Sequence, residues 1–232
     1  MSSATITTSA RLINSTPQTE EQAMVRKVAV SSFLGNFIEW FDYASYSYFA
    51  TTIALVFFPT DNHTVAMLQT FGVFALSFIL RPIGALFWGS YGDKKGRKAA
   101  LAHSIMFMSG ASFLIGCLPS YSVIGVGAPI LLLLLRMVQG FSASGEYAGA
   151  ATFLGEYAST SKRGIYCSLI PASTAIGLLA GSTLATLMTA NMNSSAMVGW
   201  GWRVPFLLAG PLGLIVLYIR AKLADSPVYQ SM

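Results

Sequence analysis

Six long apolar runs are the feature that most constrains this sequence. They lie at about 28–58, 65–91, 99–118, 124–154, 165–190 and 201–221, with polar and turn-forming residues between them. A helix needs roughly 20 consecutive, mostly apolar residues to cross the hydrocarbon core of a bilayer, so each run is long enough. The runs predict an all-α, polytopic membrane protein with six transmembrane helices.

Composition agrees with a membrane protein rather than a soluble one. Apolar residues make up 54% of the 232-residue chain and charged residues 10%, whereas soluble domains have about 25% charged residues. The formal net charge of +5 comes from short basic clusters between the apolar runs, and not from one continuous patch of the kind that binds nucleic acid. The lipid bilayer is therefore a predicted partner, and nucleic acid is not.

The basic residues alternate between the two sides of the predicted membrane. Eleven of the 14 Lys and Arg residues precede the first run, follow the second or fourth, or end the sixth, at Arg11, Arg26, Lys27, Lys94, Lys95, Arg97, Lys98, Lys162, Arg163, Arg220 and Lys222. The opposite connections, 60–64, 119–123 and 191–202, contain no Lys or Arg apart from the bordering Arg203. Because short cytoplasmic loops carry the excess of these residues, we expect both termini in the cytoplasm.

Three regions are expected along the chain. Residues 1–26 are polar and rich in Ser and Thr, and we predict a flexible cytoplasmic tail. Residues 27–222 are predicted to form the six-helix bundle, in which Pro82 and Pro171 kink their helices because proline cannot donate a helical hydrogen bond. Residues 223–232 are expected to begin a central cytoplasmic loop.

Five charged residues lie inside the predicted helices. Glu39 and Asp42 fall in the first helix, Arg81 in the second, and Arg136 and Glu146 in the fourth. A charge within a span costs at least ~2.5–3.5 kcal/mol, so such residues face a partner or a water-filled cavity and mark substrate or ion pathways. We therefore predict that these five residues line the pathway of a substrate or a proton.

Helical periodicity adds Tyr43 to this predicted pathway. At 100° per residue, Tyr43 falls in the same polar stripe as Glu39 and Asp42, while Arg136 shares a stripe with Gln139. A buried carboxylate can exchange a proton, and an opposing arginine can hold its ionised form. The sequence leaves open the alternative that these charges are ion pairs that only fix helix packing.

Enzyme and metal chemistry are not indicated. Cys117 and Cys167 lack metal-ligand spacing and are interpreted as small buried apolar residues. The only histidines, His63 and His103, fall on opposite sides of the membrane in the predicted topology. No catalytic residue, metal or cofactor is therefore expected.

The connection after the second run carries a specific motif, which reads Gly89-Ser-Tyr-Gly-Asp93-Lys-Lys-Gly96-Arg97-Lys98. Its glycines permit a tight turn between antiparallel helices, and its basic residues suit the cytoplasmic side. The spacing resembles the signature loop of the major facilitator superfamily. By that resemblance, Gly89, Asp93, Gly96 and Arg97 form a gating loop that acts as a cytoplasmic latch.

Further segments are similar to the metabolite:proton symporters of this superfamily. They occur in the family's order and read Gly35-Asn-Phe-Ile-Glu-Trp-Phe-Asp42, Arg81-Pro-Ile-Gly84, Arg136-Met-Val-Gln-Gly140, Gly145-Glu-Tyr147, Gly201-Trp-Arg-Val-Pro-Phe206 and Asp225-Ser-Pro-Val228. The resemblance covers residues 26–230 and implies proton-driven uptake of a small solute across the bacterial cytoplasmic (inner) membrane by alternating access. It also implies that Arg136 belongs to the coupling machinery and that Glu39 and Asp42 face a central cavity.

The solute is less constrained than the family. The sequence is most similar to members that carry proline and glycine betaine, and Trp40, Tyr43 and Tyr46 offer rings for cation–π contact with a quaternary ammonium. Members with the same segments carry citrate, 2-oxoglutarate or shikimate. Symport of an organic acid is therefore the alternative.

Chain length raises a last question. Transporters of this superfamily hold their substrate between two six-helix halves, and 232 residues provide one such half. We favour a fragment or truncated half of a twelve-helix protein. A half-transporter that assembles with another copy or a separate second half stays open, as does an inactive or partner six-helix membrane subunit.

Overall fold

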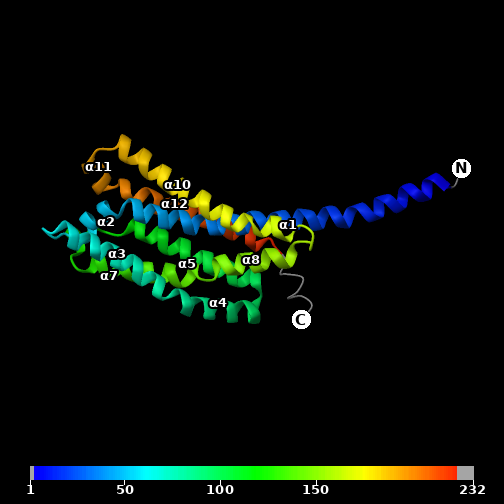
Figure 1. Ribbon diagram of the computed structural model, residues 1–232, viewed down its shortest axis with the longest axis horizontal. Coiled ribbons are helices and arrows are strands. Elements are labelled where there is room, and N and C mark those ends of the chain that lie inside the picture. The colour runs from blue at the N-terminus through cyan, green and yellow to red at the C-terminus, as the bar shows by residue number, and fades with distance from the viewer. Residues whose placement is uncertain (1–2, 224–232) are drawn as a thin grey trace.

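The protein is a bundle of helices, and no strand occurs in the part of the chain that the structure describes. Figure 1 shows the computed structural model, which describes residues 3–223, with side chains from residue 22 onward. The elements are α1 (Ser3–Tyr48), α2 (Ala50–Phe57), α3 (His63–Ile79), α4 (Arg81–Lys95), α5 (Arg97–Cys117), α6 (Tyr121–Ile124), α7 (Gly127–Ala143), α8 (Glu146–Tyr157), α9 (Arg163–Cys167), α10 (Leu169–Asn191), α11 (Ser194–Gly199), η1 (Gly201–Arg203) and α12 (Val204–Ala221).

Each predicted apolar run forms one pass along the bundle. Five passes are long and apolar enough to cross a membrane, over His63–Lys95, Arg97–Cys117, Gly127–Tyr157, Arg163–Asn191 and Gly201–Ala221. The first pass, formed by the inner part of α1 with α2, is outside that set and is the pass that contains Asn36, Glu39 and Asp42. The predicted all-α, six-helix architecture is confirmed.

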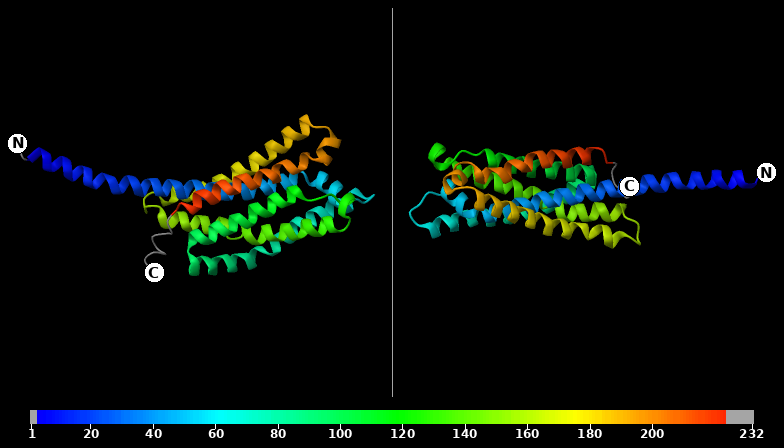
Figure 2. Two further views of the ribbon diagram at one scale, coloured as in Figure 1. Left: turned by 180° about the vertical axis from the view of Figure 1, so that it is seen from behind. Right: turned by 90° about the horizontal axis from the view of Figure 1, so that it is seen from above.

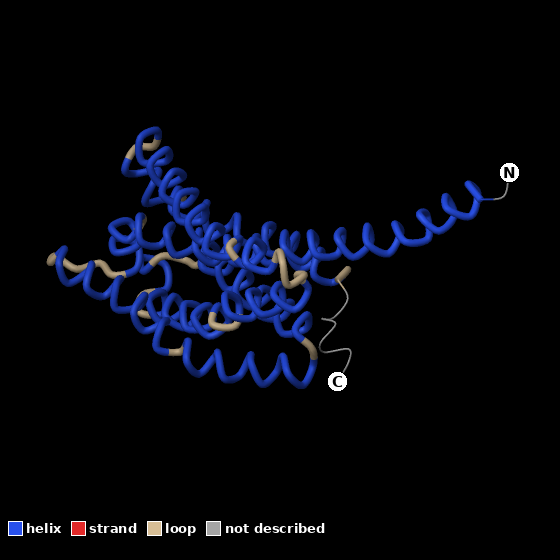
Figure 3. The backbone as a smooth tube through the Cα atoms, turned by 45° about the vertical axis from the view of Figure 1, so that its right-hand side comes forward, coloured by secondary structure: helices blue, strands red, loops and turns tan. Residues whose placement is uncertain are grey.

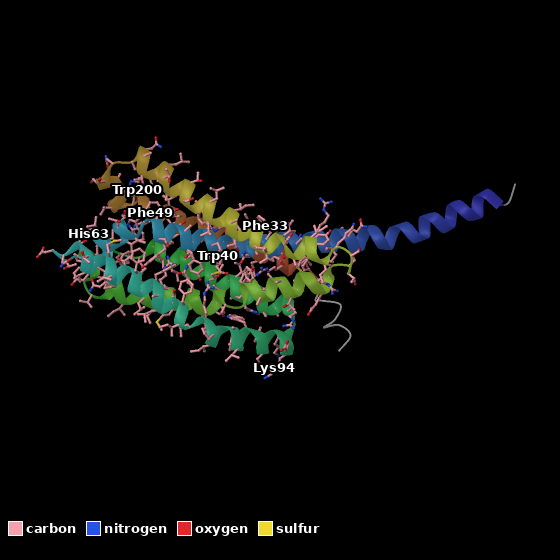
Figure 4. The ribbon with its side chains drawn as sticks, viewed as in Figure 1. Phe33, Trp40, Phe49, His63, Lys94 and Trp200 are labelled. Carbon is pink, nitrogen blue, oxygen red and sulfur yellow. The ribbon has the colours of Figure 1, made fainter. Side chains whose placement is uncertain are left out.

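The connections between passes fall at the two ends of the bundle. In Figures 1 and 2, the α4–α5 and α8–α9 connections lie at the end from which α1 projects, and the α2–α3 and α10–α11 connections lie at the other. Figure 4 labels Lys94 at the first end, and His63 and Trp200 at the second. The basic connections therefore share one end of the bundle, in agreement with the alternation of Lys and Arg.

Helix α1 differs from the expectation at its start. The structure extends α1 back to Ser3, and this extension projects beyond the bundle in Figure 3. Residues 3–26 contain Pro17 and many Ser and Thr residues, which have low helix propensity, so this helix was not expected from the sequence. The structure thus gives the segment a helical backbone, and the cytoplasmic tail stays a prediction. The predicted central loop lies outside the described residues, apart from Leu223.

Three apolar clusters follow one another along the bundle axis. The first surrounds Tyr46, Phe57 and Trp202 near one end, and a second surrounds Val28 and Phe153 near the other. A third, smaller cluster lies between them and comprises Ile38, Ile105, Met108, Ala143, Ala209 and Val216. The buried charged side chains occupy the spaces among these clusters, so apolar packing rather than water surrounds them.

Two of the passes are interrupted shortly before the prolines at which kinks were predicted. In the second pass, α3 ends at Ile79 and α4 begins at Arg81, directly before Pro82. The fifth pass is likewise interrupted between α9 and α10, shortly before Pro171. Proline lacks the backbone N–H that would continue the hydrogen-bond ladder. The break in the second pass places Arg81 opposite α1.

Helix α10 packs closely along α1 because two of its glycines face that helix. A Cβ atom at Gly177 would lie 2.8 Å from the carbonyl oxygen of Phe37, and one at Gly181 would lie 3.0 Å from that of Phe41. A side chain at either position would push the helices apart. The two glycines therefore set the distance between α1 and α10.

The two cysteines differ from the prediction of buried apolar residues. Cys117 is exposed, and Cys167 is partly exposed. Both lie in apolar segments, and Cys167 Sγ still contacts the carbonyl oxygen of Ala151 of α8 at 3.9 Å. In a membrane protein an apolar side chain need not be buried within the protein, because lipid is equally apolar.

Candidate functional site

The first buried ion pair joins α1 to α7 in the middle of the bundle. Arg136 Nη1 donates to Asp42 Oδ2 at 2.6 Å, and the two side chains are 0% and 4% exposed. Ser112 of α5 donates to Asp42 Oδ1 at 2.9 Å, and Gln139 Nε2 donates to the Ser112 oxygen. Three helices thus enclose this carboxylate, and we call Asp42–Arg136 the enclosed pair.

Aromatic rings cover the guanidinium of the enclosed pair. The guanidinium carbon of Arg136 lies 3.9 Å from the ring centre of Tyr46 and 5.4 Å from that of Phe206. Nε and Nη2 of Arg136 have no hydrogen-bond partner among the described residues. The charge of Arg136 is therefore balanced by Asp42 and by the faces of these rings.

A second pair lies one helical turn away and joins α1 to α4. Arg81 Nη2 donates to Glu39 Oε1 at 2.5 Å and also to the hydroxyl oxygen of Tyr43. Glu39 is 2% exposed, whereas the side chain of Arg81 is 25% exposed. We call Glu39–Arg81 the partly exposed pair, because part of the Arg81 side chain is accessible from outside the bundle.

A third pair joins α8 to α12 nearer the basic end. Arg220 donates to both carboxylate oxygens of Glu146, and its other contacts are the carbonyl oxygens of Leu101 at 2.5 Å and Ser31 at 3.3 Å. Ser104 donates to Glu146 Oε2 at 3.1 Å. Both charged side chains are fully buried. Arg220 was predicted only as one of the basic residues that end the sixth helix; it does lie in the last turn of α12, and its burial against Glu146 was not predicted.

The predicted gating loop forms the connection between α4 and α5. Asp93 and Arg97 pair at 3.1 Å, and Arg97 Nε lies 3.7 Å from Glu156 Oε1 of α8. Gly96 has φ 96°, a conformation that side-chain-bearing residues rarely adopt, whereas a Cβ atom at Gly89 would meet open space. Only Gly96 is therefore required by the local backbone of the turn.

The predicted pathway residues fall into separate groups. The structure brings Glu39, Tyr43 and Arg81 into one contact group and pairs Asp42 with Arg136 beside it. Glu146 belongs to a different pair, between α8 and α12. No group of three or more His, Cys, Asp or Glu side chains able to hold a metal occurs within the searched, described part of the chain.

Sequence reasoning missed the partners that come from other helices. Arg220 shares a buried stripe of α12 with Gly213 and Val216, and this helical spacing was the signal that it points inward. No comparable indication in the sequence pairs Glu156 with Arg97, because Glu156 lies at the polar end of its helix. Ser112 likewise resembles any small residue of an apolar helix.

An apolar groove on the bundle lies away from the ion pairs. It has a volume of about 580 Å³ and lies among α4, α5 and α7, lined by side chains that include Phe87, Trp88, Tyr91, His103 and Phe141. Its lining is almost entirely apolar. Such a surface suits contact with lipid rather than recognition of a charged solute.

A known protein family matches most of this sequence. The profile of the family described as sugar (and other) transporter matches residues 27–232. The chain belongs to this family. Because the family and the relatives below are transporters, the expectation that the chain is not an enzyme is confirmed.

Curated relatives agree over the same region. The chain is 41% identical over 210 residues to the proline/betaine transporter of Salmonella typhimurium, covering 90% of this chain and 42% of the relative. It is 42% identical, with the same coverage, to the glycine betaine/proline/ectoine/pipecolic acid transporter OusA of Dickeya dadantii. The chain thus spans less than half the length of these relatives.

Solved structures show the same fold. The proton:xylose symporter XylE of the major facilitator superfamily, bound to 6-bromo-6-deoxy-D-glucose, superposes with a TM-score of 0.80 at 16% identity, covering 91% of this chain and 47% of that one. Its inward open conformation gives a TM-score of 0.78 at 16% identity, covering 90% and 50%. The predicted resemblance to the major facilitator superfamily is confirmed, and the chain is a multi-pass membrane protein.

Proposed function

We propose that the protein takes part in proton-coupled symport of a small polar metabolite or compatible solute, such as proline or glycine betaine. The six helices correspond to one half of a transporter, and a second six-helix half or another copy supplies the opposite wall of the solute pathway. The names of the relatives support the solute class. The clustering of basic connections at one end supports a cytoplasmic location for both termini in the bacterial inner membrane.

The enclosed Asp42–Arg136 pair is the observation that carries this proposal. A charge buried away from water is stable only with a partner, and removing the partner's charge leaves the other charge uncompensated. Protonation of Asp42 therefore weakens its bond to Arg136 and favours rearrangement of α1 against α7. Loss of the proton restores the pair. This exchange gives proton binding a direct mechanical consequence between two helices.

The other predicted residues have different places in the proposal. Glu39, Tyr43 and Arg81 lie where the bundle is partly open and serve the solute. Glu146 holds α8 to α12 through Arg220 and keeps these helices together during the rearrangement. Asp93 and Arg97 form the latch at the basic end, where the contact with Glu156 joins the loop to α8.

An organic acid is the second candidate solute, and one observation favours it. The partly exposed guanidinium of Arg81 is a suitable ligand for a carboxylate. Glu39 stands beside that guanidinium, however, and would repel the additional negative charge of a di- or tricarboxylate. The geometry therefore supports citrate or 2-oxoglutarate less well than a solute without net negative charge.

Uptake of labelled glycine betaine and proline tests the proposal. Bacteria that lack their own uptake systems for both solutes would produce the full 232-residue chain, either alone or together with the unmatched remainder of the Salmonella typhimurium relative. We expect uptake that a protonophore abolishes. Uptake by the chain alone would show that copies assemble, and uptake only with the added segment would show that the chain functions as a half.

Matched variants make this experiment specific. Asp42→Asn should abolish the protonophore-sensitive uptake, whereas Asp61→Asn, the same change at an exposed position between α2 and α3, should not. Insertion into the membrane would be verified for each variant by fractionation. The absence of uptake of any tested solute in both settings, or full uptake by Asp42→Asn, contradicts the proposal.

A further inference from the structure

The partly exposed pair and Trp40, whose ring contacts Tyr43, have three polar atoms without hydrogen-bond partners. Among the described residues, Glu39 Oε2, Arg81 Nε and the indole Nε1 of Trp40 are buried and unpaired. Glu39 itself is almost completely buried. An unpaired buried polar group costs about 1–3 kcal/mol, so the unpaired atoms of Glu39 and Arg81, which already contact each other, indicate groups that a bound molecule could satisfy.

Aromatic rings surround the same atoms. The guanidinium carbon of Arg81 lies 5.0 Å from the ring centre of Tyr43 and 4.6 Å from that of Phe78. Trp40 meets Tyr43 edge to face, with ring centres 5.8 Å apart, and Figure 4 labels Trp40 on the ribbon of α1. These rings and the Glu39 carboxylate form a site for a cation. The cation that this structure places there is the protein's own guanidinium.

We propose that this site binds a zwitterionic solute by an exchange of ion partners. The cationic group of the solute takes the place of Arg81 against Glu39 and the rings of Tyr43 and Phe78. The carboxylate of the solute binds the displaced guanidinium of Arg81. This inference rests on the proposed function and deepens it, because it names the substrate class and the residues that select it.

Charge balance distinguishes a zwitterion from the other solute classes. A solute with a cation alone would displace Arg81 and leave the guanidinium without a counter-charge, and a solute with carboxylates alone would bring like charge toward Glu39. A neutral sugar offers no charge to replace either partner. A zwitterion replaces both partners at once, so neither protein charge is left uncompensated.

The position of Arg81 makes the exchange physically possible. Its side chain is 25% exposed, and it begins α4 directly after the break at Leu80, where the α3–α4 helix is interrupted. The enclosed pair has no such access, since Arg136 is 0% exposed and covered by Tyr46. The two neighbouring pairs therefore have separate roles, one in contact with the solute and one beyond its reach.

Binding of labelled glycine betaine to the purified full-length chain in lipid nanodiscs tests this inference. Choline offers the cation alone, acetate the carboxylate alone, and xylose neither charge. We expect unlabelled glycine betaine and proline to compete at least about tenfold better than any of these three, because each ion partner adds more than about 1.4 kcal/mol. Citrate should compete no better than acetate.

Two variants test which residue binds the cationic group of the solute and which binds its carboxylate. Glu39→Gln should remove the preference for glycine betaine over acetate, and Arg81→Gln should remove its preference over choline. The matched exposed changes Asp61→Asn and Arg163→Gln should keep both preferences. Thermal unfolding of each variant in the same nanodiscs would show which ones are folded, and the preference ratios would be compared only among folded proteins.

Three results would overturn the inference. They are no binding of glycine betaine by the folded chain, equal competition by acetate or choline, and unchanged preferences in both folded charge variants. Protonophore-sensitive uptake combined with any of them would overturn the zwitterion site alone and leave symport in place. Zwitterion-selective binding without proton-dependent uptake would support the site and contradict the coupling.

Discussion

The two acid–arginine pairs of α1 are one helical turn apart and differ mainly in their surroundings. The enclosed pair, Asp42–Arg136, is held among α1, α5 and α7, with both side chains nearly inaccessible. The partly exposed pair, Glu39–Arg81, joins α1 to the start of a broken helix, and the Arg81 side chain is 25% exposed. In the proposed function, the enclosed pair therefore exchanges the proton and the partly exposed pair binds the solute.

The two pairs contain the same types of charged group and differ in how accessible their side chains are. A proton reaches an enclosed carboxylate through small movements of the helices, but a solute needs a surface that is already open. Neutralising either carboxylate leaves an arginine without its partner, and the energetic penalty grows with burial. The predictions below use that difference, from the largest expected effect to the smallest.

Asp42→Asn should have the largest effect on both activity and stability. Proton-driven uptake should fall by at least about 100-fold, and the free energy of unfolding should fall by about 3–5 kcal/mol, because Arg136 is left as a buried, unpaired charge. Uptake assays and denaturation of the purified chain measure the two quantities. The double variant Asp42→Asn/Arg136→Gln should recover most of the stability but not the uptake. Recovery of uptake would contradict the assigned role.

Glu146→Gln should be nearly as destabilising but should leave solute recognition intact. We expect a loss of about 3 kcal/mol of unfolding free energy, at the low end for a broken buried pair, because the carbonyl oxygens of Leu101 and Ser31 still accept from Arg220. The apparent affinity for glycine betaine should change less than about twofold. A large change in solute preference would place Glu146 in the solute pathway instead.

Glu39→Gln should cost less stability than either change. A loss of about 1.5 kcal/mol is expected, the lower value for a hydrogen bond to a charged group, because water can approach the partly exposed Arg81. Solute affinity, in contrast, should fall at least tenfold. Thermal unfolding beside Asp42→Asn gives the order of stabilities, and an equal loss in the two variants would remove the distinction between the pairs.

Asp93→Asn should have the smallest effect on stability. Its carboxylate is 67% exposed in the pair with Arg97, and exposed ion pairs contribute about 0–1 kcal/mol. If the loop is a latch, the rate of uptake should still change while binding of glycine betaine in nanodiscs stays the same. Asp61→Asn is the control at an exposed loop position. A change in the equilibrium affinity for glycine betaine would show that Asp93 affects solute binding and not only the gating step.

Much of the architecture is predictable from this sequence because a bilayer imposes strong constraints. Each apolar run must be a helix that satisfies its own backbone hydrogen bonds, and basic clusters mark one side. Glu39 and Asp42 stand out because charge is rare in such helices. The start of α1 was harder, since polarity alone does not separate a flexible tail from a helix without a packing surface.

The sequence alone did not predict which charged residues on different helices form ion pairs. Periodicity assigns a residue to a face of its own helix, but it does not say which helix that face meets. Arg220 was therefore counted only as a basic residue at the end of the sixth helix, and its pairing with Glu146 was not predicted. The pairing of Asp42 with Arg136 rather than with Arg81 likewise depends on the rotation and the axial position of α4 and α7.

Comparison of solute exchange with proton-driven accumulation tests the central claim most directly. Membrane vesicles that carry the Asp42→Asn protein, or Glu39→Gln in parallel, would be assayed for exchange of internal for external glycine betaine without a proton gradient, and for accumulation with one. The division of roles predicts that Asp42→Asn retains exchange and loses accumulation, whereas Glu39→Gln loses both at low solute concentration. Loss of exchange in Asp42→Asn together with normal exchange in Glu39→Gln would contradict it.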